Sequence, residues 1–145
     1  MATFNKYNIF VKDLASGVHQ LQTGTSHVLK VALSDTTPNA ATHAVRANIS
    51  ELTTAGGYTS GGISVGTITG AESSGTFKLT GDTDPVWTGS GSGFTARYAI
   101  LYNDTPTSPA DPLIGWWDYG SSVAIGAGET LTVDLDQVNG ILTLA

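Results

Sequence analysis

Few side chains in this sequence have the types and spacing that catalysis or metal binding requires. The three histidines, His19, His27 and His43, lack the i, i+4 spacing of a helical zinc site, which leaves only a site assembled in space. The hydrolase motif Gly-x-Ser-x-Gly is absent, because the nearest run, 89–93, has Gly at its centre. The chain has no Cys and no Gly-Lys pair, which excludes a thiolate nucleophile and a phosphate-binding P-loop. We therefore expect a protein that is not an enzyme and holds no cofactor or metal.

Two pairs of carboxylates are the remaining candidates for chemistry. Asp134 and Asp136 share one face of a predicted strand about 7 Å apart, within the range of a glycosidase pair. Asp82 and Asp84 could supply oxygen ligands to Ca²⁺, although the further acids and the Gly of a calcium loop are missing. Because alternating acids on a Thr-rich strand are an ordinary solvated face, both sites are minor alternatives.

The most distinctive stretch joins a proline-rich loop to an aromatic strand. The prolines of the loop are Pro106, Pro109 and Pro112. They stiffen the chain before the predicted strand 113–119. Trp116 and Trp117 point to opposite faces of that strand, so one can fill the core and the other needs cover. Trp117 and Tyr119 are covered within the monomer, or they form an aromatic patch for protein association or sugar binding.

The elements that position these residues begin with one helix. Apolar residues recur at steps of three, four and seven: Phe4, Tyr7, Phe10, Val11, Leu14, Ala15 and Val18. This spacing predicts an amphipathic helix over about 4–16. Thr3 is expected to cap its N-terminus, and Gly17 to adopt the left-handed conformation after its last turn.

From His27 onward the period changes to two, which indicates strands. Beyond the strands around 28–33 and 45–49, the candidates are 63–69, 75–80, 94–102, 113–119, 123–125, 130–136 and 140–144. Strand 94–102 is expected to be central, with Phe94, Ala96 and Tyr98 on one face. Asn139-Gly140 predicts a hairpin that pairs 141–144 back on 130–136.

This pattern predicts a single all-β domain over residues 1–145, a β-sandwich of jelly-roll-like architecture with one short N-terminal helix. The segment 56–93, rich in Gly and hydroxyl side chains, is an alternative low-complexity linker. Its embedded apolar residues favour Thr-rich strands instead.

The charge balance restricts the partners. Twelve acids against six bases give a net charge of −6, which argues against nucleic acid and against anionic membrane surfaces. The opening MATFNKYNIF has no uninterrupted apolar region, and no run of about 18 apolar residues follows. We expect synthesis in the cytoplasm without a signal peptide.

Several segments resemble a group of small virion structural proteins of tailed bacteriophages. The similarity is sharpest in 98–106 and 116–120, and extends to 1–7, 31–35 and 140–144. It implies a capsid decoration or cement protein, which binds the outside of a shell of HK97-like major capsid proteins. No catalytic residue is carried over. A tail or head-fibre β-domain that binds a host receptor or glycan, with Trp87, Trp117 or Tyr119 as stacking platforms, is the alternative.

The resemblance further implies a location on the capsid surface of the virion, the major capsid protein as partner, and a homo-oligomer, either dimer or trimer. Candidate contact residues lie on the predicted helix, the proline-rich loop and the aromatic strand. They are Phe4, Tyr7, Phe10, Pro106, Pro109, Pro112, Trp116, Trp117 and Tyr119.

Overall fold

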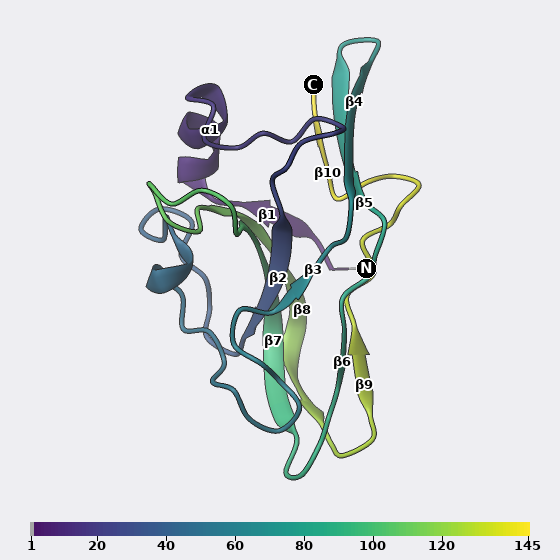
Figure 1. Ribbon diagram of the computed structural model, residues 1–145. Coiled ribbons are helices and arrows are strands. Elements are labelled where there is room, and N and C mark those ends of the chain that lie inside the picture. Colours follow the sequence, from purple (N-terminus) through teal and green to yellow (C-terminus); the bar gives the residue numbers. More distant parts are fainter. Residues whose placement is uncertain (1) are drawn as a thin grey trace.

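A computed structural model describes residues 2–145 and shows a mostly β chain with one short α-helix (Figure 1). In chain order the elements are β1 (Phe4–Lys6), α1 (Asn8–Ala15), β2 (Leu29–Ser34), the 3₁₀ turn η1 (Arg46–Asn48), β3 (Ile63–Ser64), β4 (Ile68–Ser73), β5 (Thr76–Gly81), β6 (Val86–Thr88), β7 (Phe94–Asn103), β8 (Leu113–Ile125), β9 (Thr130–Thr132) and β10 (Leu142–Leu144). Within the described residues no helix is long and apolar enough to cross a membrane.

All strand pairs are antiparallel and form three sheets. The largest sheet has five strands in the order β1-β8-β7-β2-β3. A three-stranded sheet, β10-β5-β4, and a two-stranded sheet, β6-β9, face it. Strand β7 lies between β8 and β2, so the prediction of a central strand is confirmed.

Apolar residues cover the five-stranded sheet on both faces. On one face Leu29, Val31 and Leu101 join a core cluster with Leu79 and Trp87 of the smaller sheets. On the other face a second cluster is built from Tyr7, Ala32, Tyr98, Ile100, Tyr102 and Leu113. This alternation along β2 and β7 is the period-two pattern expected of buried strands.

The face assignment of Phe94 and Ala96 was wrong, because the ladder between β7 and β8 shifts register between Ala96 and Tyr98. Phe94 and Ala96 therefore pack in the cluster of Leu101, opposite Tyr98. A β-bulge adds residues to one strand and reverses the faces that follow, which a simple alternation cannot anticipate.

The helix begins four residues later than predicted. Residues 4–6 pair with β8 as β1, so sheet pairing replaces the first helical turn. Tyr7 is the N-cap in extended geometry without a side-chain cap, and the expected role of Thr3 is wrong. Gly17 has a φ of 75°, which confirms the left-handed ending.

Several strand boundaries also differ. The segment 45–49 contains η1 instead of a strand, 63–69 is divided between β3 and β4, and 113–125 is one continuous strand. The predicted C-terminal hairpin is wrong, because β10 pairs with β5. Segment 56–93 holds four ordered strands, so it is not a linker.

Candidate functional site

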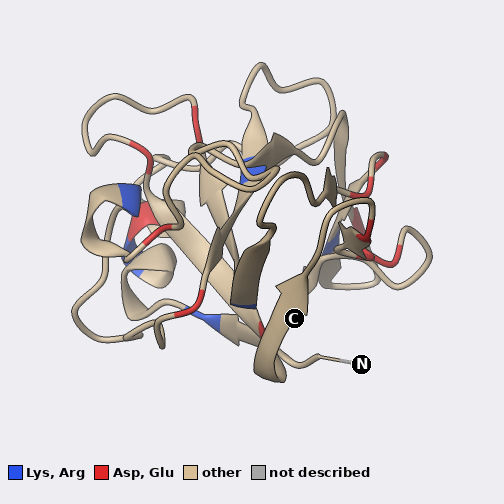
Figure 2. Cartoon of the chain, turned by 90° about the horizontal axis from the view of Figure 1, so that it is seen from below, with Lys and Arg blue, Asp and Glu red and all other residues tan. Residues whose placement is uncertain are grey.

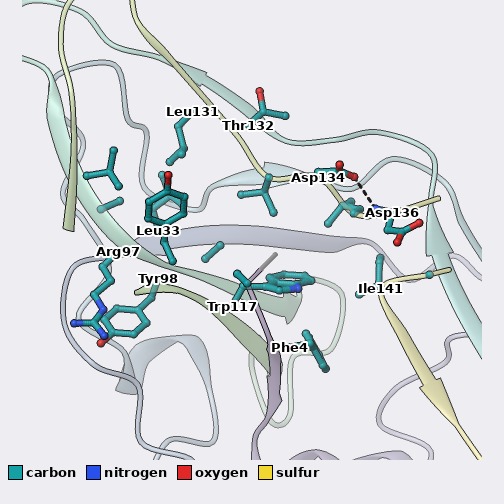
Figure 3. Close-up of a pocket in the computed structure, with 18 of the residues that line it drawn as sticks. Phe4, Leu33, Arg97, Tyr98, Trp117, Leu131, Thr132, Asp134, Asp136 and Ile141 are labelled. Atoms are coloured by element: carbon teal, nitrogen blue, oxygen red, sulfur yellow. Dashed lines mark hydrogen bonds between the residues drawn. The ribbon is translucent and has the colours of Figure 1, made fainter. Parts of the chain in front are cut away.

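An apolar groove lies between one face of the five-stranded sheet and the segment 131–141, which begins in β9. Its larger part has a volume of about 530 Å³, and Figure 3 shows side chains of both banks directed into it. A smaller hollow of about 380 Å³ continues it along β1 and β10. The two hollows share four lining residues: Phe4, Asn139, Gly140 and Ile141. They therefore form one continuous groove.

Phe4 and Trp117 form the floor at the β1 side. The antiparallel register places Phe4 directly opposite Trp117, and their rings meet edge to face with centroids 5.1 Å apart. Gly115 allows this approach, because a Cβ on Gly115 would overlap the Phe4 ring and the backbone of Asn5. Trp117 is half-buried, so the monomer covers it only in part.

Tyr119 stands at the rim on a bulge of β8. Tyr98 pairs with Asp118 while Ala96 pairs with Val123, so the residues from 119 to 122 leave the ladder. Arg97 Nε and Nη2 donate to the two Asp118 oxygens at 2.8 and 3.0 Å, and the Gly120 amide donates to Oδ1 at 2.8 Å. The Arg97 hydrogen bonds lower the pKa of Asp118 below its usual value. This anchored bulge leaves Tyr119 66% exposed.

The opposite bank carries the two carboxylates of the sequence hypothesis. Strand β9 ends at Thr132, and Asp136 has a φ of 48°, so the strand predicted to reach 136 ends four residues early. Asp134 Oδ1 accepts the Asp136 amide at 2.9 Å. Asp136 accepts the Asn139 amide and side chain at 2.9 and 2.8 Å, which lowers its pKa. Both residues line the groove, and Figure 3 shows the hydrogen bond that joins them.

Both hollows of the groove contain charged residues. Lys6 lies in the smaller hollow, while Arg97, Asp134 and Asp136 lie in the larger one. Within residues 2–145 Arg97 pairs with Asp118, and the other three belong to no ion pair. Charged residues elsewhere are few and scattered over the molecule (Figure 2). The groove therefore carries charges of both signs.

The predicted contact residues divide among four places. Phe4, Trp117 and Tyr119 come together in the groove. Tyr7 and Pro112 are buried within the monomer. Phe10 is also buried, and it lines the bottom of the smaller hollow. Trp116 is half-buried against Tyr7, with ring centroids 4.7 Å apart. Pro106 is half-buried and Pro109 exposed on the loop before β8.

The proline-rich loop is held by its neighbours. Arg46 Nε donates to Asp111 Oδ2 at 3.2 Å, and the Arg46 amide donates to the Asp111 carbonyl at 2.9 Å. Pro112 forms a β-bridge with Val45. The loop tip, which includes Pro109 and Ala110, is thus an exposed surface on a braced support.

The three histidines lie in two different places. His19 and His27 both contact the Asn103 side-chain nitrogen, at 3.3 and 2.9 Å, while His43 stacks on Tyr7. No group of three His, Cys, Asp or Glu side chains in residues 2–145 is arranged to hold a metal ion. Trp87 is 3% exposed, so it cannot serve as a surface stacking platform.

The sequence did not indicate the other residues of the groove. Leu33, Leu131 and Ile141 read as ordinary core positions, yet they line it beside Phe4. To find these residues from the sequence, one would have to know how distant strands pair. Strands β1 and β10 come from opposite ends of the sequence, and both border the groove.

Comparison with known proteins gives no match to a protein-family model, a curated protein or a solved structure.

Proposed function

We propose that this protein is a non-enzymatic capsid decoration protein. It binds as a homo-oligomer to the outside of a shell of HK97-like major capsid proteins and stabilises that shell. Its subunit is a β-sandwich of jelly-roll-like architecture. The facing of a five-stranded sheet by two smaller sheets across one apolar cluster supports this architecture.

The observation that carries the proposal is the position of the segment 98–120, where the phage resemblance is sharpest. It forms most of the β7–β8 hairpin, the centre of the largest sheet. The hairpin carries two exposed surfaces, the braced loop tip around Pro109 and the groove rim at Tyr119. A rigid hairpin that presents separate surfaces suits a protein that contacts both its own copies and a shell.

Sedimentation with undecorated expanded heads tests the proposal. Saturable co-sedimentation is expected, and loss of binding is expected for Ala110→Glu, which adds a charge at the exposed loop tip. Ser73→Glu makes the same change on the exposed β4–β5 hairpin, away from that loop, and should bind like the unaltered protein. Absence of saturable binding by the unaltered protein would refute the proposal.

A fibre domain that binds a glycan or receptor is the second candidate. It is favoured by Tyr119, 66% exposed beside the half-buried Trp117, since aromatic faces serve as platforms for sugar rings. A glycan array and a cell-binding assay would show binding that Tyr119→Ser abolishes. Antibody labelling confined to the shell of the virion, together with no glycan signal, would exclude this candidate.

A further inference from the structure

We propose that Asn139 is a site of spontaneous covalent modification, and that Asp136 keeps the reaction slow while the chain is folded. The reaction is deamidation, in which the side-chain amide of asparagine becomes a carboxylate. The site lies in the turn before β10, and the inference is independent of the proposed capsid function.

The pair Asn139-Gly140 has the groups that this reaction needs. The Gly140 backbone nitrogen gives up its proton and attacks Cγ of Asn139, the side-chain amide leaves with that proton as ammonia, and a succinimide ring forms. Water then opens the ring at either carbonyl, which gives aspartate or isoaspartate at position 139. Because glycine has no side chain, nothing shields its nitrogen. This is the only Asn-Gly pair of the 145 residues, and Asn139 is exposed to water.

Asp136 binds both the attacking and the leaving group of this reaction. Its carbonyl oxygen accepts the Gly140 amide at 2.7 Å, which keeps the proton on the attacking nitrogen. Its Oδ2 accepts the Asn139 side-chain nitrogen at 2.8 Å, and its Oδ1 accepts the Asn139 backbone amide at 2.9 Å. Ring closure therefore requires that the bonds from the Gly140 amide and from the Asn139 side chain both break.

The packing around the turn requires the glycine that makes the pair reactive. Gly140 has a φ of 95°, and a Cβ at this position would lie 2.8 Å from the Leu79 carbonyl oxygen and from the Lys78 side chain. Lys78 Nζ also donates to the Val138 carbonyl at 3.0 Å, so the turn is held on β5. A less reactive residue after Asn139 would therefore disturb this packing, and the restraint by Asp136 is what remains to slow the reaction.

The modification would change the start of β10 and the groove beside it. Aspartate at position 139 places a second carboxylate against Asp136 in place of a donor, and like charges repel. Isoaspartate also adds a methylene to the backbone, while Ile141 is fixed to β5 by the bond from its amide to the Leu79 carbonyl at 2.7 Å. Asn139 and Gly140 lie where the two hollows join, so the reaction would reshape the groove at this point.

Mass spectrometry of the ageing protein tests the proposal. Cleavage after Glu129 releases the fragment 130–145, in which Asn139 is the only asparagine. In warm, mildly alkaline buffer the folded chain should convert at least tenfold more slowly than the same chain in concentrated urea. A synthetic peptide of residues 130–145, with and without urea, corrects for the effect of urea on the chemistry. Asn139→Gln should show no conversion at this position.

Two variants test the role of Asp136. Asp136→Gly accepts the φ of 48° and removes both carboxylate contacts, so the folded variant should convert at least tenfold faster than the unaltered protein, since a hydrogen bond to a charged group is typically worth more than a factor of ten. Asp136→Asn also tolerates positive φ but has one acceptor oxygen instead of two, and should accelerate the reaction less. The control Asp82→Gly removes an exposed carboxylate that accepts the Thr67 amide in another turn, and should leave the rate unchanged.

The effect on β10 is measured separately by hydrogen exchange. Asn139→Asp reproduces the aspartate product, and the Ile141 amide should exchange faster than in the unaltered protein. Asn39→Asp adds the same charge to a turn in which Oδ1 only accepts, from the Ala41 and Thr42 amides, so Ile141 exchange should not change.

Three results would overturn the inference: no conversion at position 139 in the unfolded chain, equal rates in the folded and unfolded chains, or folded Asp136 variants that both convert no faster than the unaltered protein. Circular dichroism verifies that each variant is folded. The comparison of the folded and unfolded chain uses no variant, so it decides the first two results even where a substitution prevents folding.

Discussion

Lowering the pH should destabilise the fold through His19. This imidazole is 3% exposed, and its pKa is lowered from 6.5 to about 4, mainly by burial and secondarily by the charge of His27. Its Nδ1 lies 3.3 Å from the Asn103 side-chain nitrogen, which can only donate. Protonation of Nδ1 would therefore place two donors against each other at a buried position.

The magnitude follows from the difference between the two pKa values. Because the folded pKa is the lower one, the unfolded chain binds the proton first as the pH falls. The contribution is complete above pH 6.5 and is lost between pH 6.5 and pH 4. At pH 5 the loss is about 2 kcal/mol, and below pH 4 it approaches about 3 kcal/mol. This is a considerable part of the stability of a typical domain, about 5–15 kcal/mol.

Urea unfolding at pH 7.5 and pH 5.0 measures this loss. His19→Phe keeps an aromatic ring beside Phe10 but cannot be protonated. The unaltered protein should lose about 2 kcal/mol more than this variant between the two pH values. His43→Gln leaves the His19 contacts intact and should behave like the unaltered protein.

A direct titration completes the test. Nuclear magnetic resonance of the His19 ring should give a midpoint near pH 4. An equal loss of stability in the unaltered protein and His19→Phe, or a midpoint near the ordinary value of about 6.5, would refute the reasoning.

Three further substitutions test the supports of the two exposed surfaces. Glu51→Gln should lower the free energy of unfolding by about 2 kcal/mol, because the carboxylate, 11% exposed, pairs with Arg46 at 2.9 Å; urea unfolding measures this. Gly115→Ala should displace β1, since its Cβ would overlap Phe4, and hydrogen exchange at the β1–β8 amides should accelerate. Asp118→Asn should loosen the bulge, and the Gly120 amide should exchange faster, because the charged pair with Arg97 is lost.

Two of these substitutions have matched controls. Glu72→Gln changes an exposed carboxylate outside the Arg46 pair and should cost little. Gly126→Ala adds a methyl group where the first neighbour is the end of the flexible Glu129 side chain. Equal effects in the test variant and its control, or an unchanged Gly120 exchange rate in Asp118→Asn, would contradict the corresponding argument.

Local patterns predicted the elements that depend on local forces. The run 94–102 alternates strongly and is the central strand β7, and Gly17 ends the helix as its freedom at positive φ allows. The helix start at residue 4 failed because Phe4 has both helical spacing and a place opposite Trp117 in a sheet. The pairing with β8 favours the strand over the helix at Phe4. This pairing involves residues far away in the sequence, so a local sequence pattern cannot reveal it.

The candidate site was predicted in part for the same reason. The adjacent Trp116 and Trp117 showed that one aromatic side chain would need cover, and Trp117 does line the groove. The bank formed by Leu131 and Ile141 arises only when β10 pairs with β5 instead of returning to β9. Asn139-Gly140 indicated a turn correctly, but a turn does not specify the partner of the strand after it.

The pairing of β1 with β8 has a consequence for how the chain folds. Phe4 and Trp117 are neighbours in the sheet but lie far apart in the sequence, so their contact closes a very long loop. Folding dominated by such contacts belongs to the slow class, on the order of milliseconds to seconds. The β7–β8 hairpin closes a much shorter loop and can form first. Until β1 docks on this hairpin, the outer edge of β8 has no partner. During this time unfinished chains can pair with one another through that edge. The docking of the three residues of β1 ends this period.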